Sequence, residues 1–271
     1  ASDGSSFDGY IVGAMVFQDL NGNGEWDEGE PRAYTDENGA YSLNLVAGSS
    51  AFIIVKGVEG SYDKETGVAF TGVYKAPPGS TVVSPLTTMV SSFMASGLSA
   101  AEALSQMRSI LGITDSSFDL LSFDPWDASA DSNFAASIKS QGQVVGELLR
   151  AGGNSTSMVT SVANALLEGV KSGQSLNETL SDVGNLTSIF NSAGADSSGV
   201  AALADKLLSK GSTYTVNADV IAAVGGVQGL KLATLKSQGI QKIDIYVNDQ
   251  ARDTLLHIDS AGAQAMDDAD M

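Results

Sequence analysis

Oxygen-bearing side chains recur at fixed intervals within one short segment, which begins at Asp19 and ends at Glu30. With Asp19 as loop position 1, these side chains occupy positions 1, 3, 5, 9 and 12, and a glycine occupies position 6. Ca²⁺ takes about 6 to 8 hard oxygen ligands, and this spacing wraps them round one ion while the glycine allows a sharp turn. We therefore predict a Ca²⁺ site with the ligands Asp19, Asn21, Asn23, Glu25, Asp27 and Glu30.

The predicted ligands would reach the ion in different ways. Glu25 would contribute its main-chain carbonyl and Glu30 both carboxylate oxygens, while the other side chains would bind directly or through water. Asparagines at positions 3 and 5 lower the affinity relative to aspartates without abolishing binding. The alternative is a solvated acidic turn, rich in Asn and Gly, that binds no ion.

The segments on either side of this loop are strand-like, so the two helices of an EF-hand are missing. Ile11, Val16 and Phe17 precede the loop, and residues 34–43 follow it. Short β-branched and aromatic runs at residues 10–17, 40–46, 51–58, 68–74 and 80–83 predict an antiparallel sandwich of about seven short strands. The Asn38-Gly39 pair suits the turn between two of them, because both residues accept positive φ.

The loop and its continuation resemble a known group of modules. Residues 19–30 and 35–41 match the pattern Asp-x-Asn-x-Asn-Gly-x-x-Asp-x-x-Glu followed by Thr-Asp-x-Asn-Gly-x-Tyr. This pattern is typical of the calcium-binding B-type repeats, which are Cna-B-like or carboxypeptidase-regulatory-like sandwiches, of large bacterial surface adhesins and secreted repeat proteins. Residues 80–89 are similar to the Thr-Pro-Leu-Thr-Thr segment that follows such sandwiches. The resemblance implies a structural calcium ion and a place on the cell surface or in a secreted matrix.

A change of spacing at Ser84 separates this β region from a helical one. Ser99 with Glu102 and Ser175 with Glu178 form capping boxes, which mark helix starts. We predict an α+β multidomain chain that comprises an N-terminal β-sandwich (1–83), a central bundle of about five or six helices (84–210) and a small C-terminal α/β unit (211–271). The last unit is either incomplete or completed by a neighbour.

Further elements follow from the apolar pattern. Apolar stripes from 134 to 148 and from 158 to 170 predict core-facing helices. In the C-terminal unit we predict helices at 217–224 and 231–238, strands at 242–247 and 254–258, and a final helical run that ends at Met271.

Charge and composition restrict the partners. The chain has 14 Lys and Arg against 32 Asp and Glu, which gives a formal net charge of −18 and repels nucleic acid and anionic lipid. Cysteine is absent, so disulfides and thiolate sites are excluded. No apolar run reaches the roughly 20 residues of a membrane span. We expect no nucleic acid partner and no membrane insertion.

Catalytic motifs are scarce. The one histidine, His257, stands in an alternating strand-like run, so a histidine zinc site is excluded. The Ser61-x-x-Lys64 match lies in an expected hairpin loop instead of at a helix start. We therefore expect no enzyme, although a pair of acids in a deep pocket away from the 19–30 loop would favour a carboxylate-only hydrolase.

An acidic run offers a second possible calcium site, with a solvated linker between helices as the alternative. Its members are Asp115, Asp119, Asp124, Asp127 and Asp131.

Two functions from different classes remain. The first is an extracellular structural or assembly module whose partners are other copies of the chain or neighbouring modules of the same protein. The second is a ligand-binding module of an adhesin that recognises a glycan or a protein, with Trp26 and Trp126 as candidate aromatic platforms.

Overall fold

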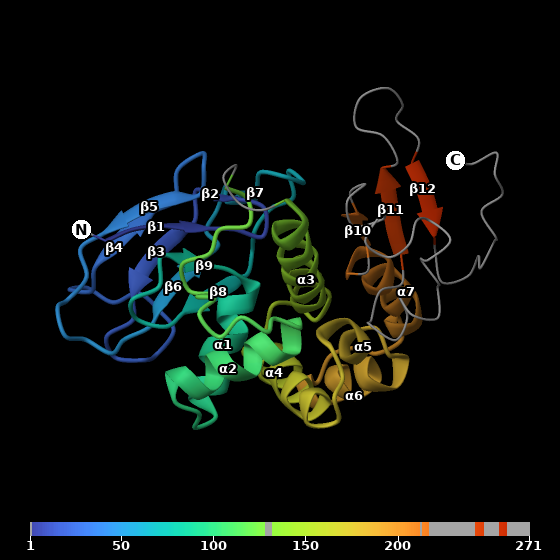
Figure 1. The fold of residues 1–271 in the computed structure, drawn as a ribbon. Helices are drawn as coiled ribbons and strands as arrows, with labels where there is room; N and C mark the ends of the chain where they lie inside the picture. Colours follow the sequence, from blue (N-terminus) through green and yellow to red (C-terminus); the bar gives the residue numbers. More distant parts are fainter. Residues whose placement is uncertain (1, 128–131, 212, 217–241, 247–254, 259–271) are drawn as a thin grey trace.

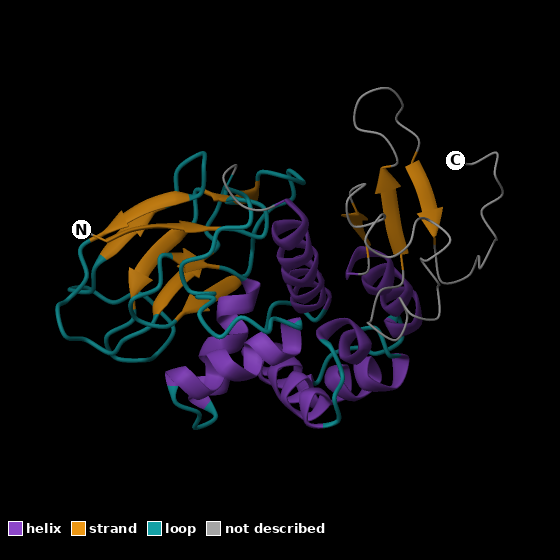
Figure 2. Cartoon of the chain, in the orientation of Figure 1, coloured by secondary structure: helices purple, strands orange, loops and turns teal. Residues whose placement is uncertain are grey.

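The computed structural model describes residues 2–127, 132–211, 213–216, 242–246 and 255–258, and within them the protein is a mixed α+β fold (Figure 1). The helices predicted at 217–224 and 231–238 and the final helical run lie outside the described residues. In Figure 2 the strands of residues 2–83 lie on one side of the helices, and the last three strands lie on the other.

Two sheets and a ribbon form from the first 83 residues. The larger sheet has the antiparallel order β4-β3-β6-β8, the smaller has the order β5-β1-β9, and β2 pairs with β7. The strands are β1 (Ser2–Ser6), β2 (Ile11–Val12), β3 (Met15–Gln18), β4 (Arg32–Tyr34), β5 (Ala40–Leu43), β6 (Ile53–Lys56), β7 (Tyr62–Asp63), β8 (Val73–Ala76) and β9 (Val82–Val83).

The strand sequences account for their places. In β5, Tyr41 and Leu43 are buried while Ala40 and Ser42 are exposed, which is the alternation of a strand with one solvated face. In β6, Ile53, Ile54 and Val55 are all buried. Because neighbouring side chains of a strand point to opposite faces, both faces of the sheet are covered here. The two edges of β6 are paired with β3 and with β8.

The predicted strand regions are confirmed in part: residues 10–17 form two strands, β2 and β3, and the strand predicted at 68–74 begins only at Val73. β1, β4 and β7 lie outside the predicted ranges. β1 pairs in parallel with β9, so the prediction of a wholly antiparallel sandwich is wrong at that pair.

Three helix starts were predicted from capping residues, at Ser84, Ser99 and Ser175, and each is confirmed. The described residues after Ser84 form seven helices instead of the predicted five or six, because two of them are separated only by a short break at residues 181–182. The helices are α1 (Pro85–Ala95), α2 (Ala100–Leu111), α3 (Ser132–Ala151), α4 (Thr156–Lys171), α5 (Leu176–Leu180), α6 (Val183–Ala193) and α7 (Val200–Gly211). Ser84 and Ser99 are N-caps that form capping boxes with Thr87 and Glu102, and Ser175 caps α5.

The hydrophobic core runs from the sheet into the helices without interruption. α1 lies against β8, where the Lys75 N–H donates to Thr88 Oγ1 (2.9 Å) and Thr87 Oγ1 donates to the Lys75 carbonyl (2.7 Å). Phe93 of α1 is fully buried in the same cluster as Val55 of the sheet and as residues of α3, α4 and α6. The secondary structure changes at Ser84, but the core continues across that point.

Three strands follow the helices: β10 (Thr213–Val216), β11 (Lys242–Tyr246) and β12 (Leu255–Ile258). β11 is parallel to β10 and antiparallel to β12, and His257 stands opposite Asp244. The strands predicted at 242–247 and 254–258 are confirmed. Among the residues that the structure describes, no helix combines the length and apolar character needed to cross a bilayer.

Three tyrosines should resist ionisation. Burial raises the pKa of Tyr10, Tyr41 and Tyr74 above the ordinary 10.0, and the carboxylates of Asp124 and Asp8 raise it further for Tyr10 and Tyr74 respectively. Because the folded pKa exceeds the unfolded one, the stabilisation is complete below pH 10 and is lost as the pH rises toward the folded pKa. Phenolate absorbance should therefore show a late step that coincides with unfolding, and a normal titration of all tyrosines in the folded protein would contradict this.

Candidate metal centre

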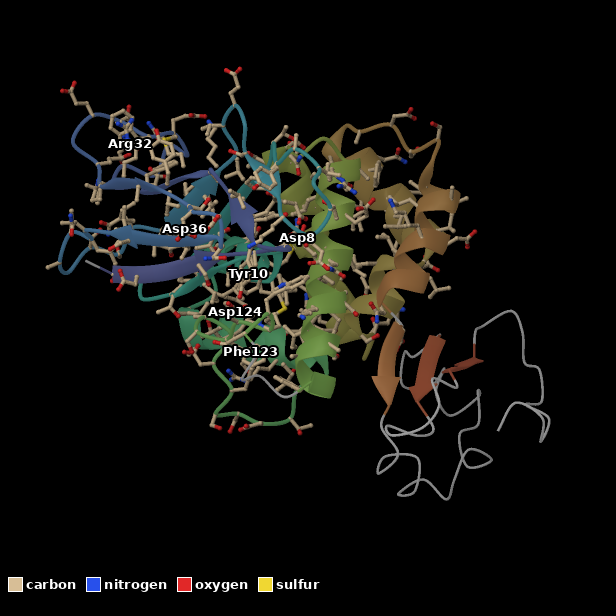
Figure 3. All side chains as sticks on the ribbon, turned by 90° about the horizontal axis from the view of Figure 1, so that it is seen from above. Asp8, Tyr10, Arg32, Asp36, Phe123 and Asp124 are labelled. Carbon is tan, nitrogen blue, oxygen red and sulfur yellow. The ribbon has the colours of Figure 1, made fainter. Side chains whose placement is uncertain are left out.

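The 19–30 loop connects β3 to β4 and is closed at its base by main-chain hydrogen bonds. The Gln18 N–H donates to the Pro31 carbonyl (3.2 Å), and the Asp19 N–H donates to the Phe52 carbonyl (3.0 Å). The second bond anchors the first predicted ligand to the segment just before β6. Figure 3 labels Arg32, the first residue of β4, directly beyond this loop.

The carboxylate of Asp19 accepts three main-chain hydrogen bonds that shape the first half of the loop. Its Oδ1 accepts the N–H groups of Gly22 (2.9 Å) and Asn23 (3.2 Å), and its Oδ2 accepts that of Gly24 (2.9 Å). Gly22 and Gly24 have φ of +73° and +80°, a region that favours glycine, so the turn depends on both. Asp19 is only 4% exposed.

Glu30 closes the loop from its other end. Its Oε1 accepts the Leu20 N–H (2.7 Å) and its Oε2 accepts the Asp27 N–H (3.0 Å), while its carbonyl accepts Trp26 Nε1–H (3.0 Å). Glu30 is 9% exposed. The first and last predicted ligands are therefore buried together at the base of the loop, each holding main-chain N–H groups.

The side chains of Asn21, Asn23 and Asp27 lie outside these two carboxylates and are exposed. Asn21 Nδ2 and Asn23 Nδ2 both donate to Asp27 Oδ2 at 2.7 Å. Five of the six predicted ligands thus share one local hydrogen-bond network. The side chain of Glu25 leaves it and forms an ion pair with Lys56 of β6, which is compatible with the main-chain role that we predict for Glu25.

The donor set suits a hard divalent cation. Neither Asp19 nor Glu30 has an ion pair with Lys or Arg among the described residues, and buried carboxylates are costly without a compensating charge. In the described part of the chain, no three Asp, Glu, His or Cys side chains gather closely enough to hold a metal by themselves. A bound ion would therefore need amide and main-chain oxygens, and the exposed amides of Asn21 and Asn23 would turn their oxygens toward it.

Both candidate aromatic platforms carry a cation on one ring face. The Arg32 guanidinium lies 3.9 Å from the Trp26 ring centroid, and Lys139 Nζ lies 4.2 Å from that of Trp126. Trp126 also lies beside Tyr10, with ring centroids 6.3 Å apart. Each indole is half-buried and covered on the face that its cation occupies.

The acidic run mainly caps its own turns. Asp115 Oδ1 accepts the N–H and the hydroxyl of Ser117, and these hydrogen bonds lower the pKa of the Asp115 carboxyl. Asp119 Oδ1 accepts the Leu121 N–H (3.0 Å). Asp124 accepts the Trp126 N–H (2.8 Å) and the hydroxyl of Tyr10 (3.0 Å). Asp131 lies outside the described residues, so the second calcium site stays a prediction.

Comparison with protein-family models, with curated proteins and with solved structures finds no match to this chain.

One polar cavity was not predicted. It lies where the strands meet α3 and is lined by Asp8, Asp63, Tyr74, Glu147 and Arg150, among others. These residues are far apart in the sequence and match no motif. One sequence signal is Gly146, which lies in the middle of a helix, where glycine is unfavourable, and lines the cavity.

Proposed function

We propose that this chain is a calcium-stabilised structural module of a bacterial cell-surface or extracellular-matrix protein, and that it works by rigidity and by joining other modules. The observation that carries the proposal is the 19–30 loop, which closes on two buried carboxylates, Asp19 and Glu30. A calcium ion there would offset their charge and fasten the end of β3 to the start of β4.

The proposed module has the architecture of a β-sandwich followed by a helical bundle and a small α/β unit. The core that joins α1 to β8 supports a rigid junction between the first two parts. Calcium would then stiffen the exposed 19–30 loop of the β region, while β8 is already held in place by its packing against α1.

The charge of the chain supports assembly that depends on calcium. At a net charge of −18, copies of the protein repel one another unless cations screen or bridge them. A calcium-rich exterior supplies such cations. The proposed partners are other copies of this chain or neighbouring modules of the same protein.

Light scattering tests this proposal. Calcium titrated into metal-stripped protein should raise the molar mass of the wild type, and the double variant Asp19→Ala plus Glu30→Ala should stay at its initial mass. Glu28→Gln is the matched control, because it removes a charge from the same loop at a position that is not a predicted ligand. A constant monomer mass for the wild type at all calcium concentrations would refute assembly.

A further inference from the structure

A cavity of about 260 Å³ lies between the strands and the helices, away from the 19–30 loop. On the strand side it is lined by Asp8, Asp63 and Tyr74, and on the helix side by Glu147 and Arg150 of α3 and by Lys206 of α7. Figure 3 labels Asp8 at the place where the strands meet α3. The cavity is smaller than the roughly 300 to 1,000 Å³ that drug-sized ligands fill, so it suits a single small ring.

The polar groups of the cavity are held in place by the protein itself. Tyr74 donates its hydroxyl proton to Asp8 Oδ2 (2.9 Å), and Asp63 Oδ1 accepts the N–H groups of Glu65 (2.8 Å) and Thr66 (3.3 Å). Glu147 forms ion pairs with both Arg150 and Lys206. Groups that are oriented before binding lose little freedom when a ligand arrives.

Two glycines leave room for the two carboxylates on the strand side. A Cβ built on Gly146 of α3 would overlap the carboxylate of Asp8, and one built on Gly9 would overlap that of Asp63. Gly146 lies in the interior of a helix of 20 residues, where glycine weakens the helix. Its presence there allows α3 to approach Asp8.

The charges indicate a neutral ligand. Three carboxylates (Asp8, Asp63, Glu147) and two cations (Arg150, Lys206) leave a local formal charge of −1. An anion would meet three carboxylates, and the described residues hold no acid cluster of the kind that binds a metal by itself. Hydroxyl groups can donate to the carboxylates and accept from the guanidinium, so a ligand with several hydroxyl groups can bind the acidic and the basic side chains of the cavity together.

The cavity also has an apolar wall. Ile11, Val68 and Ala69 line it together with Phe70 and Tyr74, which are 8% and 4% exposed and whose ring centroids lie 5.0 Å apart. The C–H groups of a sugar ring pack well on aromatic side chains while its hydroxyls bind the polar groups around them. A groove of 400 Å³ between α4 and α6 has no aromatic residue in its lining and lacks this combination.

We propose that this cavity binds one neutral sugar ring, either as a free monosaccharide or as the end of a glycan. This activity goes beyond the structural role and is independent of the 19–30 loop. The cavity does hold acids away from the 19–30 loop, which is the feature that would favour a hydrolase. Each acid is already engaged as an acceptor, however: Asp8 by the Tyr74 hydroxyl, Asp63 by two main-chain N–H groups and Glu147 by two cations. A general acid must carry a proton to donate, so binding is favoured over hydrolysis.

Calorimetric titration of the full chain tests the proposal, with a panel of neutral hexoses and N-acetylhexosamines as ligands. Asp63→Asn is the informative variant, since its Oδ1 can keep the two turn hydrogen bonds while a carboxylate acceptor of the cavity becomes an amide donor. We expect binding to at least one sugar, weakened roughly 10- to 100-fold in Asp63→Asn. Asp8→Asn is the second variant, and Glu168→Gln in the α4–α6 groove is the matched control.

A parallel arm presents the same sugars as the ends of immobilised glycans, which separates a free sugar from a glycan as the source. Each titration is repeated with calcium and with a chelator. Sugar binding that both cavity variants weaken and the control retains supports the site, whatever the calcium result. No binding in either arm, or binding that both cavity variants leave unchanged, would overturn it without touching the calcium proposal.

Discussion

Calcium should raise the melting temperature of metal-stripped protein, and the double variant Asp19→Asn plus Glu30→Gln should lose that rise. A ligand at hundredfold excess over its Kd stabilises the folded state by about 2.7 kcal/mol. For a domain of this size that corresponds to roughly 5 to 11 °C. The effect is large because an ion at this loop would compensate two buried carboxylates that have no Lys or Arg ion pair among the described residues.

The measurement is thermal unfolding followed by circular dichroism, with and without calcium. Glu28→Gln is again the control, and its rise with calcium should equal that of the wild type. The double variant should also be less sensitive to calcium removal, because two of its buried charges are already neutral. A wild type whose melting temperature does not respond to calcium would favour the solvated acidic turn.

The second large effect is expected from Phe93→Ala, which should destabilise the strands and the helices together. Phe93 is fully buried in α1, within the core that links the sheet to α3, α4 and α6. Truncation of a buried Phe to Ala costs about 3 to 5 kcal/mol, from lost burial and from the cavity that remains. That is a large share of the roughly 5 to 15 kcal/mol by which a folded domain is stable.

Denaturant unfolding followed by two probes tests whether the strands and the helices lose stability together in Phe93→Ala. Trp26 fluorescence, measured in a Trp126→Phe background so that the second indole does not contribute, reports on the β region. Far-ultraviolet circular dichroism reports mainly on the helices. Both midpoints should fall by the same amount in Phe93→Ala, whereas Tyr34→Ala, at a side chain that is 53% exposed, should change them little. Two separated transitions would mean that strands and helices unfold independently.

Local signals predicted the helix starts well. Ser84, Ser99 and Ser175 accept N–H groups of the first turns. Ser99 and Ser175 are recognisable because a glutamate stands three residues later, and Ser84 because Pro85 and the change of spacing follow it. The 19–30 loop could be located for the same reason, since its predicted ligands lie within one short stretch of chain and five of them share one hydrogen-bond network. In both cases the residues that interact are close in sequence.

Features made by distant residues were not predictable. β1 reads Ser-Asp-Gly-Ser-Ser, which has no β-branched or aromatic residue, and it is a strand because it pairs with β5 and β9. The cavity escapes prediction in the same way, because Asp8 and Arg150 line one cavity only when α3 packs against the strands. The covered faces of Trp26 and Trp126 likewise depend on Arg32 and Lys139, which no spacing rule connects to them.

The position of β1 affects how the fold would carry mechanical load. β1 is parallel to β9, and β9 leads directly into α1. A force applied between Ser2 and Pro85 would slide the two strands along each other instead of peeling them apart. The Ser5 N–H to Thr81 carbonyl and Phe7 N–H to Val83 carbonyl bonds lie across that direction and would have to break together. Such an arrangement would resist tension along the chain, which is the load that the proposed place on a cell surface would put on it.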